Sequence, residues 1–149
     1  MHTGNSILIR APLDRIFETA ANLEDWPKIL PHYRYIHYID RGTDRHVVKM
    51  ACHRSGIPIS WVSEQIIDRE KREVRFHHLR AFTKGMDVVW TFSPQPGGEI
   101  RVQILHDLRF RIPVLSFLAE PIIGGFFISH VAGQTLLHMK KYLENESRR

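Results

Sequence analysis

The chain has 149 residues, of which 43% are hydrophobic and 25% charged, a composition typical of an ordinary soluble globular protein. This length predicts one domain, 1–149, with a substantial core. The single cysteine, Cys52, excludes an internal disulfide; it lies in a strand-like run and is interpreted as a core thiol in a protein of the reducing cytoplasm. The first residues, Met1–Ser6, show no basic region followed by an apolar run, so no secretory signal is predicted.

The formal charge of +5 concerns the partners of the protein rather than its fold. The basic residues are scattered, and the one dense block, Arg69–Arg75, also holds Glu70 and Glu73 and is typical of a solvated turn. The charge suits an acidic carrier protein or an anionic membrane surface equally well. Nucleic-acid binding is the weakest of these readings, and we expect none.

The first part of the chain combines one strand with short helical segments. A β-rich alternation predicts a strand over Asn5–Arg10. Ala11-Pro12 then begins a helix, because proline is tolerated in the first helical turn, and Asn22 is a plausible stop. The segment Trp26–Tyr33 is interrupted by two prolines, which predicts a loop or a second short helix that carries two large aromatic side chains.

From Tyr33 onward the pattern has a period of two, which predicts strands separated by short turns. Short turns between successive strands indicate antiparallel hairpins. With the first strand, the total is seven. The six further strands are predicted over Tyr33–Arg41, His46–Arg54, Ile57–Asp68, Glu73–Arg80, Met86–Ser93 and Glu99–Ile112.

The last long element is an amphipathic helix over Phe126–Leu143. Its apolar arc covers about half of the helix circumference, so a single strand or a single partner helix would leave part of it exposed. A curved sheet covers such an arc, and we therefore predict an α+β fold in which a seven-stranded antiparallel sheet curves around this helix. Leu137 is the one large apolar residue outside the arc, which consists of Phe127, Ile128, Val131, Ala132, Thr135, Leu136, Met139, Tyr142 and Leu143.

The run Ile112–Ile128 is almost wholly apolar. Glu120, Pro121 and the pair Gly124-Gly125 interrupt it, and it is slightly shorter than the roughly 20 residues that span a membrane. One reading is a buried loop and short helix that lead into the final helix. The other is a lid at a cavity mouth or a surface that makes transient contact with lipid.

Polar side chains on the apolar faces of the strands indicate a cavity. His106 lies on the apolar face of the last strand, where it is either a core histidine with a hydrogen-bond partner or an acid, base or donor in a cavity. A compact core does not normally accept so many such side chains, whereas a ligand pocket does. The other residues of this kind on inward faces, with their aromatic and apolar neighbours, are Arg54, Trp61, Ser63, Gln65, His78, Met86 and Trp90.

The sequence shows no pattern for a metal or a cofactor. The pairs His77-His78 and His106-Asp107 are adjacent on strands, so the members of each pair point to opposite faces and cannot share one ion. There is no glycine-rich phosphate loop and no nucleophile elbow. We therefore expect neither a metal nor a cofactor.

The order of these elements and several short motifs resemble the START-like, helix-grip (Bet v 1-like) superfamily, and within it the polyketide cyclase/dehydrase (aromatase/cyclase) group. The resemblance runs from about Asn5 to Leu143. Each motif alone is unspecific, but their order and spacing together are fairly specific for the fold. The motifs are Asn5-Ser6-Ile7, Ala11-Pro12, Trp26-Pro27 with Tyr33, Trp61-Val62-Ser63, Met86 with Trp90-Thr91-Phe92, and the Gly97-Gly98 turn.

The resemblance implies that a poly-β-ketone held by an acyl carrier protein enters a cavity beneath the final helix and undergoes aldol closure and dehydration. It assigns Tyr33 as the proton donor, Ser63 as a hydrogen-bond partner, and Trp26 and Trp61 as walls. Where the cyclases carry an arginine, this chain has Gln65, which orients a carbonyl but supplies no fixed charge to an enolate. Arg54 and His106 are the candidates to replace that arginine.

Two functions therefore remain. The first is a cyclase/dehydrase with the catalytic residues Tyr33, Ser63 and His106. The second is a non-catalytic carrier of a lipid, quinone or polyketide, which Gln65 and the apolar run Ile112–Ile128 favour. Either function predicts a hydrophobic or aromatic ligand in contact with the helix residues Val131, Thr135 and Met139.

Overall fold

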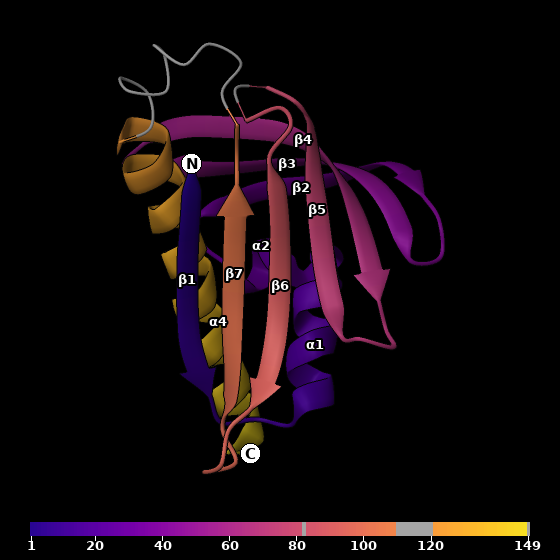
Figure 1. Ribbon diagram of the computed structural model, residues 1–149, viewed down its shortest axis with the longest axis vertical. Coiled ribbons are helices and arrows are strands. Elements are labelled where there is room, and N and C mark those ends of the chain that lie inside the picture. The colour runs from indigo at the N-terminus through magenta and orange to yellow at the C-terminus, as the bar shows by residue number, and fades with distance from the viewer. Residues whose placement is uncertain (82, 110–120, 149) are drawn as a thin grey trace.

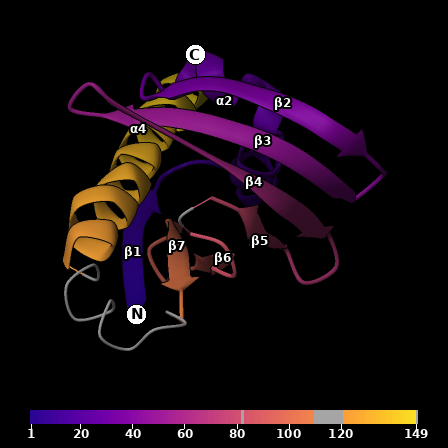
Figure 2. The ribbon, with the colours of Figure 1, turned by 90° about the horizontal axis from the view of Figure 1, so that it is seen from above.

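The structure, a computed structural model, describes residues 1–81, 83–109 and 121–148. Seven antiparallel strands form one sheet in the order β1-β7-β6-β5-β4-β3-β2. The sheet curves around the long helix α4, which crosses its concave side (Figures 1 and 2). This is the α+β helix-grip arrangement that the sequence predicts, with seven strands, short helices after the first strand and a long C-terminal helix.

The seven strands are β1 (His2–Ile9), β2 (Tyr33–Arg41), β3 (Arg45–Arg54), β4 (Ile57–Asp68), β5 (Glu73–Arg80), β6 (Asp87–Pro94) and β7 (Ile100–Asp107). The helices are α1 (Leu13–Ala21), a 3₁₀ turn η1 (Leu23–Asp25), α2 (Trp26–Ile29), the π-helix η2 (Pro121–Ser129) and α4 (His130–Ser147). None of the helices in the described part of the chain is long and apolar enough to cross a membrane.

The ends of the strands lie at two opposite edges of the sheet, because neighbouring strands run in opposite directions. We call one of them the mouth edge; it holds the strand ends at Arg54, Ile57, Arg80, Asp87 and Asp107. It is the upper edge in Figure 1. The other, the far edge, holds the β2–β3, β4–β5 and β6–β7 turns.

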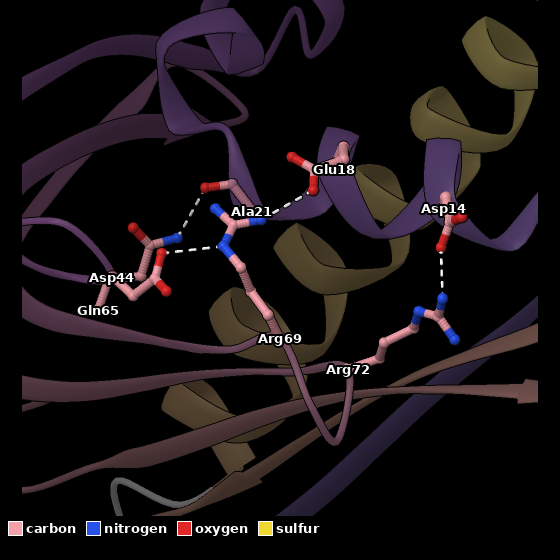
Figure 3. A network of polar contacts seen from close by, with 7 residues as sticks. All are labelled: Asp14, Glu18, Ala21, Asp44, Gln65, Arg69 and Arg72. Carbon is pink, nitrogen blue, oxygen red and sulfur yellow. Dashed lines mark hydrogen bonds and ion pairs between the residues drawn. The ribbon is translucent and has the colours of Figure 1, made fainter.

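Helix α1 is tied to the turns of the far edge (Figure 3). Arg69 in the β4–β5 turn binds Glu18 of α1 at 2.8 Å and Asp44 of the β2–β3 turn at 3.0 Å. Arg72 binds Asp14 of α1 at 2.7 Å. Three chain segments are therefore linked by ion pairs at this edge, and α1 covers the sheet there.

The C-terminal helix differs from the prediction in its first and last turns. The predicted start at Phe126 lies within η2, and regular α-helix begins at His130 and runs to Ser147 rather than to Leu143. Leu137 is 37% exposed, which confirms it as the apolar residue outside the buried arc. Tyr142 is 40% exposed, so its predicted burial is wrong. Its ring lies beside the Arg15–Glu146 ion pair rather than in the core.

The last strand is shorter than predicted. β7 ends at Asp107, and Leu108 and Arg109 follow it without strand structure. The remaining predicted strand residues, 110–112, and most of the apolar run 112–128 lie outside the described residues. Within β7 the predicted alternation holds, since Val102 and Ile104 are buried and Arg101 and Leu105 are exposed.

Candidate ligand cavity

A cavity of about 80 Å³ lies between the concave face of the sheet and the first turns of α4. Its walls come from α2, the strands, η2 and α4, so it requires the whole fold. It is lined by Trp26, Tyr33, Met50, Cys52, Ile59, Trp61, Phe76, His78, Thr83, Met86, Val88, Trp90, Ile104, His106, Phe127, Ile128, Val131, Ala132 and Thr135.

The inner end of the cavity is an aromatic wall built around Trp26. The indole of Trp26 is 2% exposed, and its Nε1–H donates to the carbonyl oxygen of Thr19 at 3.1 Å. Its ring lies 5.2 Å from that of Tyr33 and 5.6 Å from that of Trp90. A buried indole with its N–H satisfied is a stable apolar surface, and the edge-to-face contact with Tyr33 helps to fix its orientation.

His78 projects inward from β5. Its Nδ1 is 2.7 Å from Thr83 Oγ1, and its ring stacks on Trp61 with centroids 5.5 Å apart and 8° between the planes. Burial, together with the neighbouring His106 and His77, lowers the pKa of His78 to about 3. The imidazole is therefore neutral at physiological pH, and its contacts hold the ring in one orientation.

His106 lies on the neighbouring part of the wall, on β7. Its Nδ1 is buried and has no hydrogen-bond partner in the described structure. Burial lowers the pKa of His106 to about 4, so this imidazole is also neutral at pH 7. A buried nitrogen without a partner is costly in an empty site and is satisfied when a ligand supplies a hydroxyl or carbonyl group.

A third polar group joins Tyr33, Thr135 and His32. The Thr135 hydroxyl donates to the Val131 carbonyl at 2.8 Å and lies 2.9 Å from His32 Nε2. Burial raises the pKa of the Tyr33 phenol well above its usual range, while its hydrogen bond with Thr135 lowers it by a smaller amount. Tyr33 is therefore a neutral phenol at the cavity wall, able to donate a proton or a hydrogen bond.

His32 is a polar neighbour of the site that the sequence pattern does not reveal. It occupies the turn before β2 and is 9% exposed. Burial lowers its pKa to about 4, and the nearby His138, His53 and His130 contribute to this shift. Its Nδ1 is buried without a partner in the described structure. A residue in a turn follows neither strand nor helix periodicity, which is why the pattern gives no signal for it.

Nine of the residues predicted from the sequence line this one cavity: Trp26, Tyr33, Trp61, His78, Met86, Trp90, His106, Val131 and Thr135. Ser63, Gln65, Arg54 and Met139 are not among its described lining residues. Thr83, Phe127 and Cys52 line it in addition. Burial raises the pKa of the Cys52 thiol to about 12, so this side chain is a neutral thiol rather than a thiolate nucleophile.

Ser63 and Gln65 are each 0% exposed, and neither is among the described lining residues of the cavity. The Gln65 side chain donates from Nε2 to the carbonyl oxygen of Ala21 at 3.0 Å (Figure 3). It thereby satisfies one of the carbonyl groups left free at the end of α1. The face assignment of these residues is right, but at Gln65 the end of α1 fills the inward side of β4. Met139 is likewise 0% exposed and belongs to the solid core under α4.

Arg54 lies at the mouth edge, outside the cavity wall. Its Nε donates to the carbonyl oxygen of Phe126 at 3.1 Å, and its guanidinium lies 4.3 Å from the centre of the Phe126 ring. Arg54 therefore connects the β3–β4 hairpin to η2, next to Phe127 in the wall. In this position its guanidinium is not part of the described cavity lining.

The sequence matches a family model over residues 9–127, described as polyketide cyclase/dehydrase and lipid transport. The chain belongs to this family. It is 33% identical over 100 residues to a protein of Streptomyces halstedii named "Putative polyketide cyclase", a match that covers 65% of this chain and 92% of that protein. A protein of the same name from Streptomyces cyaneus is 32% identical over 100 residues, covering 65% of this chain and 66% of the relative.

Solved structures show the same fold at low sequence identity. The Zhui aromatase/cyclase from Streptomyces sp. R1128 aligns with a TM-score of 0.87 and 16% identity, over 99% of this chain and 96% of that one. A protein from Thermus thermophilus aligns with a TM-score of 0.84 and 19% identity, over 99% of both chains. A START superfamily protein from Mycobacterium smegmatis aligns with a TM-score of 0.69 and 14% identity, over 99% and 97%. These likenesses confirm the helix-grip fold.

Proposed function

We propose that this polyketide cyclase/dehydrase family member binds a polyketide or a similar aromatic precursor in the cavity and promotes its aldol ring closure and dehydration. The observation that carries the proposal is an apolar cavity, in the described part of the chain, whose hydrogen-bonding groups are all neutral. Tyr33 holds its proton because burial raises its pKa, whereas His106 and His78 lack theirs because burial lowers their pKa values to about 4 and about 3. A proton donor and proton acceptors thus coexist at pH 7.

In the proposed reaction His106 accepts a proton from the carbon between two carbonyl groups of the substrate. The resulting carbon nucleophile attacks a second carbonyl group, a C–C bond forms, and Tyr33 donates its proton to the carbonyl oxygen, which becomes a hydroxyl. Loss of this hydroxyl and of a neighbouring hydrogen as water gives the unsaturated ring. The imidazolium returns its proton to the phenolate. Aromatic walls hold the chain in a folded conformation, which lowers the entropic barrier to closure.

The cavity sets limits on the ligand. Its volume of about 80 Å³ is below the roughly 300–1,000 Å³ typical of pockets around drug-sized molecules. A larger ligand therefore enters only when side chains of the mouth, such as Phe127 and Val131, move aside. No Asp, Glu, Lys or Arg is among the described lining residues, so the preferred ligand is an uncharged ring or chain with a few carbonyl or hydroxyl groups.

The same observation supports a second function, a non-catalytic carrier of a lipid, quinone or polyketide. A developing enolate is strongly stabilised by a fixed positive charge, and the described cavity wall has none, because Gln65 is uncharged and Arg54 binds Phe126 outside the wall. A carrier requires no such charge. The two functions also differ in partners: the cyclase receives its substrate from an acyl carrier protein, whereas the carrier exchanges its ligand with a membrane.

Ring closure of a poly-β-ketone mimic distinguishes the two functions. We expect Tyr33→Phe and His106→Ala each to lower the rate about 100-fold or more, the usual contribution of a proton-transfer group. Ser63→Ala is the matched control, because Ser63 is a buried polar residue of the same sheet but does not line the cavity. Unchanged closure in both cavity variants rules out the cyclase, and a lipid or isoprenoid that co-purifies with the protein, identified by mass spectrometry, supports the carrier.

A further inference from the structure

Three hydrogen-bonded side chains lead from the cavity wall into the protein beside it. Tyr33, at the start of β2, and Thr135, on α4, both line the cavity. His32, in the turn before β2, adjoins Thr135 and is not among the described lining residues. All three are buried, with Tyr33 at 8%, Thr135 at 2% and His32 at 9% exposure. Only Tyr33 takes part in the ring closure proposed above, so two buried polar groups next to it are not used by that reaction.

The hydroxyl group of Thr135 is the centre of this set. It donates to the carbonyl oxygen of Val131, one turn earlier in α4, at 2.8 Å, and it lies 2.9 Å from Nε2 of His32. It also hydrogen-bonds the Tyr33 phenol. A hydroxyl group has one hydrogen to donate and two lone pairs that accept. With its hydrogen on Val131, the Thr135 oxygen therefore accepts from both His32 and Tyr33.

His32 reaches two acceptors with the same nitrogen. Its Nε2 faces the Thr135 oxygen, and its imidazole also donates to the backbone carbonyl of Val131. Its Nδ1, in contrast, is buried and has no partner in the described structure. The hydrogen-bond network therefore places the hydrogen of the neutral imidazole on Nε2, with both acceptors within its reach.

Loss of the Tyr33 proton to a ligand changes what these groups must supply. The phenolate oxygen is a buried anion, which is costly unless a donor turns toward it. Apart from Thr135, no hydrogen-bond partner of the Tyr33 side chain appears in the described structure. Rotation about the Cβ–Oγ bond of Thr135 moves its hydrogen from the Val131 carbonyl to the phenolate. The Nε2–H of His32 then serves the Val131 carbonyl in its place.

We propose that His32 is a positioning residue that acts through Thr135 to make Tyr33 a better proton donor. His32 holds the Thr135 hydroxyl next to the phenol and replaces it at the Val131 carbonyl when the hydroxyl turns to the phenolate. The proposal rests on the proposed function, because ring closure is the step that consumes the Tyr33 proton. The link between the three side chains, however, is a property of the protein without substrate and can be measured on its own.

The test is the acidity of the Tyr33 phenol in the full chain without substrate. A difluorinated tyrosine in place of Tyr33 lowers the intrinsic pKa of the phenol and supplies a fluorine NMR signal for its titration. One hydrogen bond to a charged group corresponds to about 1–2 in pKa, so Thr135→Val should raise the pKa of this phenol by about that amount. His32→Phe should raise it by less, and it should add nothing in the Thr135→Val background, because His32 acts through Thr135.

Conservative variants separate this role from a merely structural one. Thr135→Ser keeps the hydroxyl group and His32→Gln keeps an N–H donor, so the phenol in both should titrate close to that of the unmodified protein. His138→Phe is the matched control. The His138 ring lies 6.2 Å from that of His32, and no hydrogen bond joins it to these side chains in the described structure. We expect His138→Phe to leave the pKa of the phenol unchanged.

The ring-closure assay connects this link to the reaction. With Tyr33 unmodified, Thr135→Val should lower kcat by roughly 3- to 10-fold with little change in KM, because the rate follows the acidity of the proton donor only in part. The proposal is overturned if Thr135→Val or His32→Phe leaves the pKa of the phenol unchanged, or if His138→Phe raises it as much as His32→Phe does. A raised pKa in a protein that does not close the ring keeps the link and rules out the proposed function instead.

Discussion

The two edges of the sheet use similar residues for opposite purposes. At the far edge, Arg69 and Arg72 bind carboxylates of α1 and of the β2–β3 turn, so charge holds separate chain segments together. At the mouth edge, Arg80 and Lys84 bind no carboxylate in the described structure, and the buried Nδ1 of His106 has no partner there. The ion pairs of the far edge join separate segments of the protein, whereas these two cations and this nitrogen at the mouth edge have no such partner in the described structure.

This difference continues inward along α4. The end of the helix near the far edge packs into solid core, with Met139 and Leu143 at 0% and 1% exposure. The end near the mouth roofs the cavity, where Val131 is partly exposed. The same helix is therefore structural in one half and part of a binding site in the other, and substitutions along it separate the two roles.

The largest effect on stability is expected when a side chain in the solidly packed half of α4 is shortened. Met139→Ala removes a fully buried side chain and leaves a cavity that its neighbours fill only in part, which should cost about 2–5 kcal/mol in the free energy of unfolding. Val131→Ala, about two turns earlier, removes a side chain that already borders empty space and should cost about 1 kcal/mol or less. Urea denaturation measures both. If the two variants lose the same free energy of unfolding, α4 does not have one half in solid core and one half over a cavity.

The second prediction concerns acid. Burial holds the pKa of His78 at about 3, below the ordinary value of 6.5 that applies in the unfolded chain. The unfolded state therefore binds more protons between these values, and the contribution of His78 to stability is complete above pH 6.5 and is lost as the pH falls toward 3. Between pH 7.5 and pH 5, this loss is about 2 kcal/mol.

His78→Gln should remove that share of the pH dependence, while other acid-sensitive groups remain. His77 is the matched control, because it is the preceding residue on β5 but is exposed and faces Asp87. We expect His77→Gln to keep the slope of the unmodified protein. If unfolding free energies at pH 7.5 and pH 5 differ by the same amount in His78→Gln and in His77→Gln, His78 is not held neutral by the fold.

The strands and the helix–sheet arrangement could be predicted because their signals are local. Alternation and short turns specify each hairpin, and the wide apolar arc of the last helix requires a curved partner. The inward direction of His78 and His106 follows from the same alternation. The π-helical turn at Pro121–Ser129 has no comparable signal, since an apolar run is compatible with several backbone paths.

The position of the cavity within the inward face could not be predicted in the same way. Alternation places Gln65 and Trp61 on one face of β4. Only the packing of α1 decides that Gln65 contacts Ala21 while Trp61 lines the cavity. The prediction that Tyr142 is buried was wrong for a related reason. A helical wheel treats all turns of a helix alike, whereas the last turns of α4 lie beside Arg15 of α1. Contacts between distant segments decide such cases.

The smallest expected effect tests the ion pairs of the far edge. Arg69→Met keeps an aliphatic stem but removes the contacts with Glu18 and Asp44, and the arginine side chain is 49% exposed, so solvent screens both pairs. The expected loss is about 0.5–1 kcal/mol at low salt, and it should shrink in 1 M NaCl. Arg80→Met at the mouth edge breaks no ion pair of the described structure and should leave stability unchanged. If the two variants lose the same free energy of unfolding at low salt, the ion pairs of Arg69 do not stabilise the fold, and the two edges do not differ in what their cations contribute to stability.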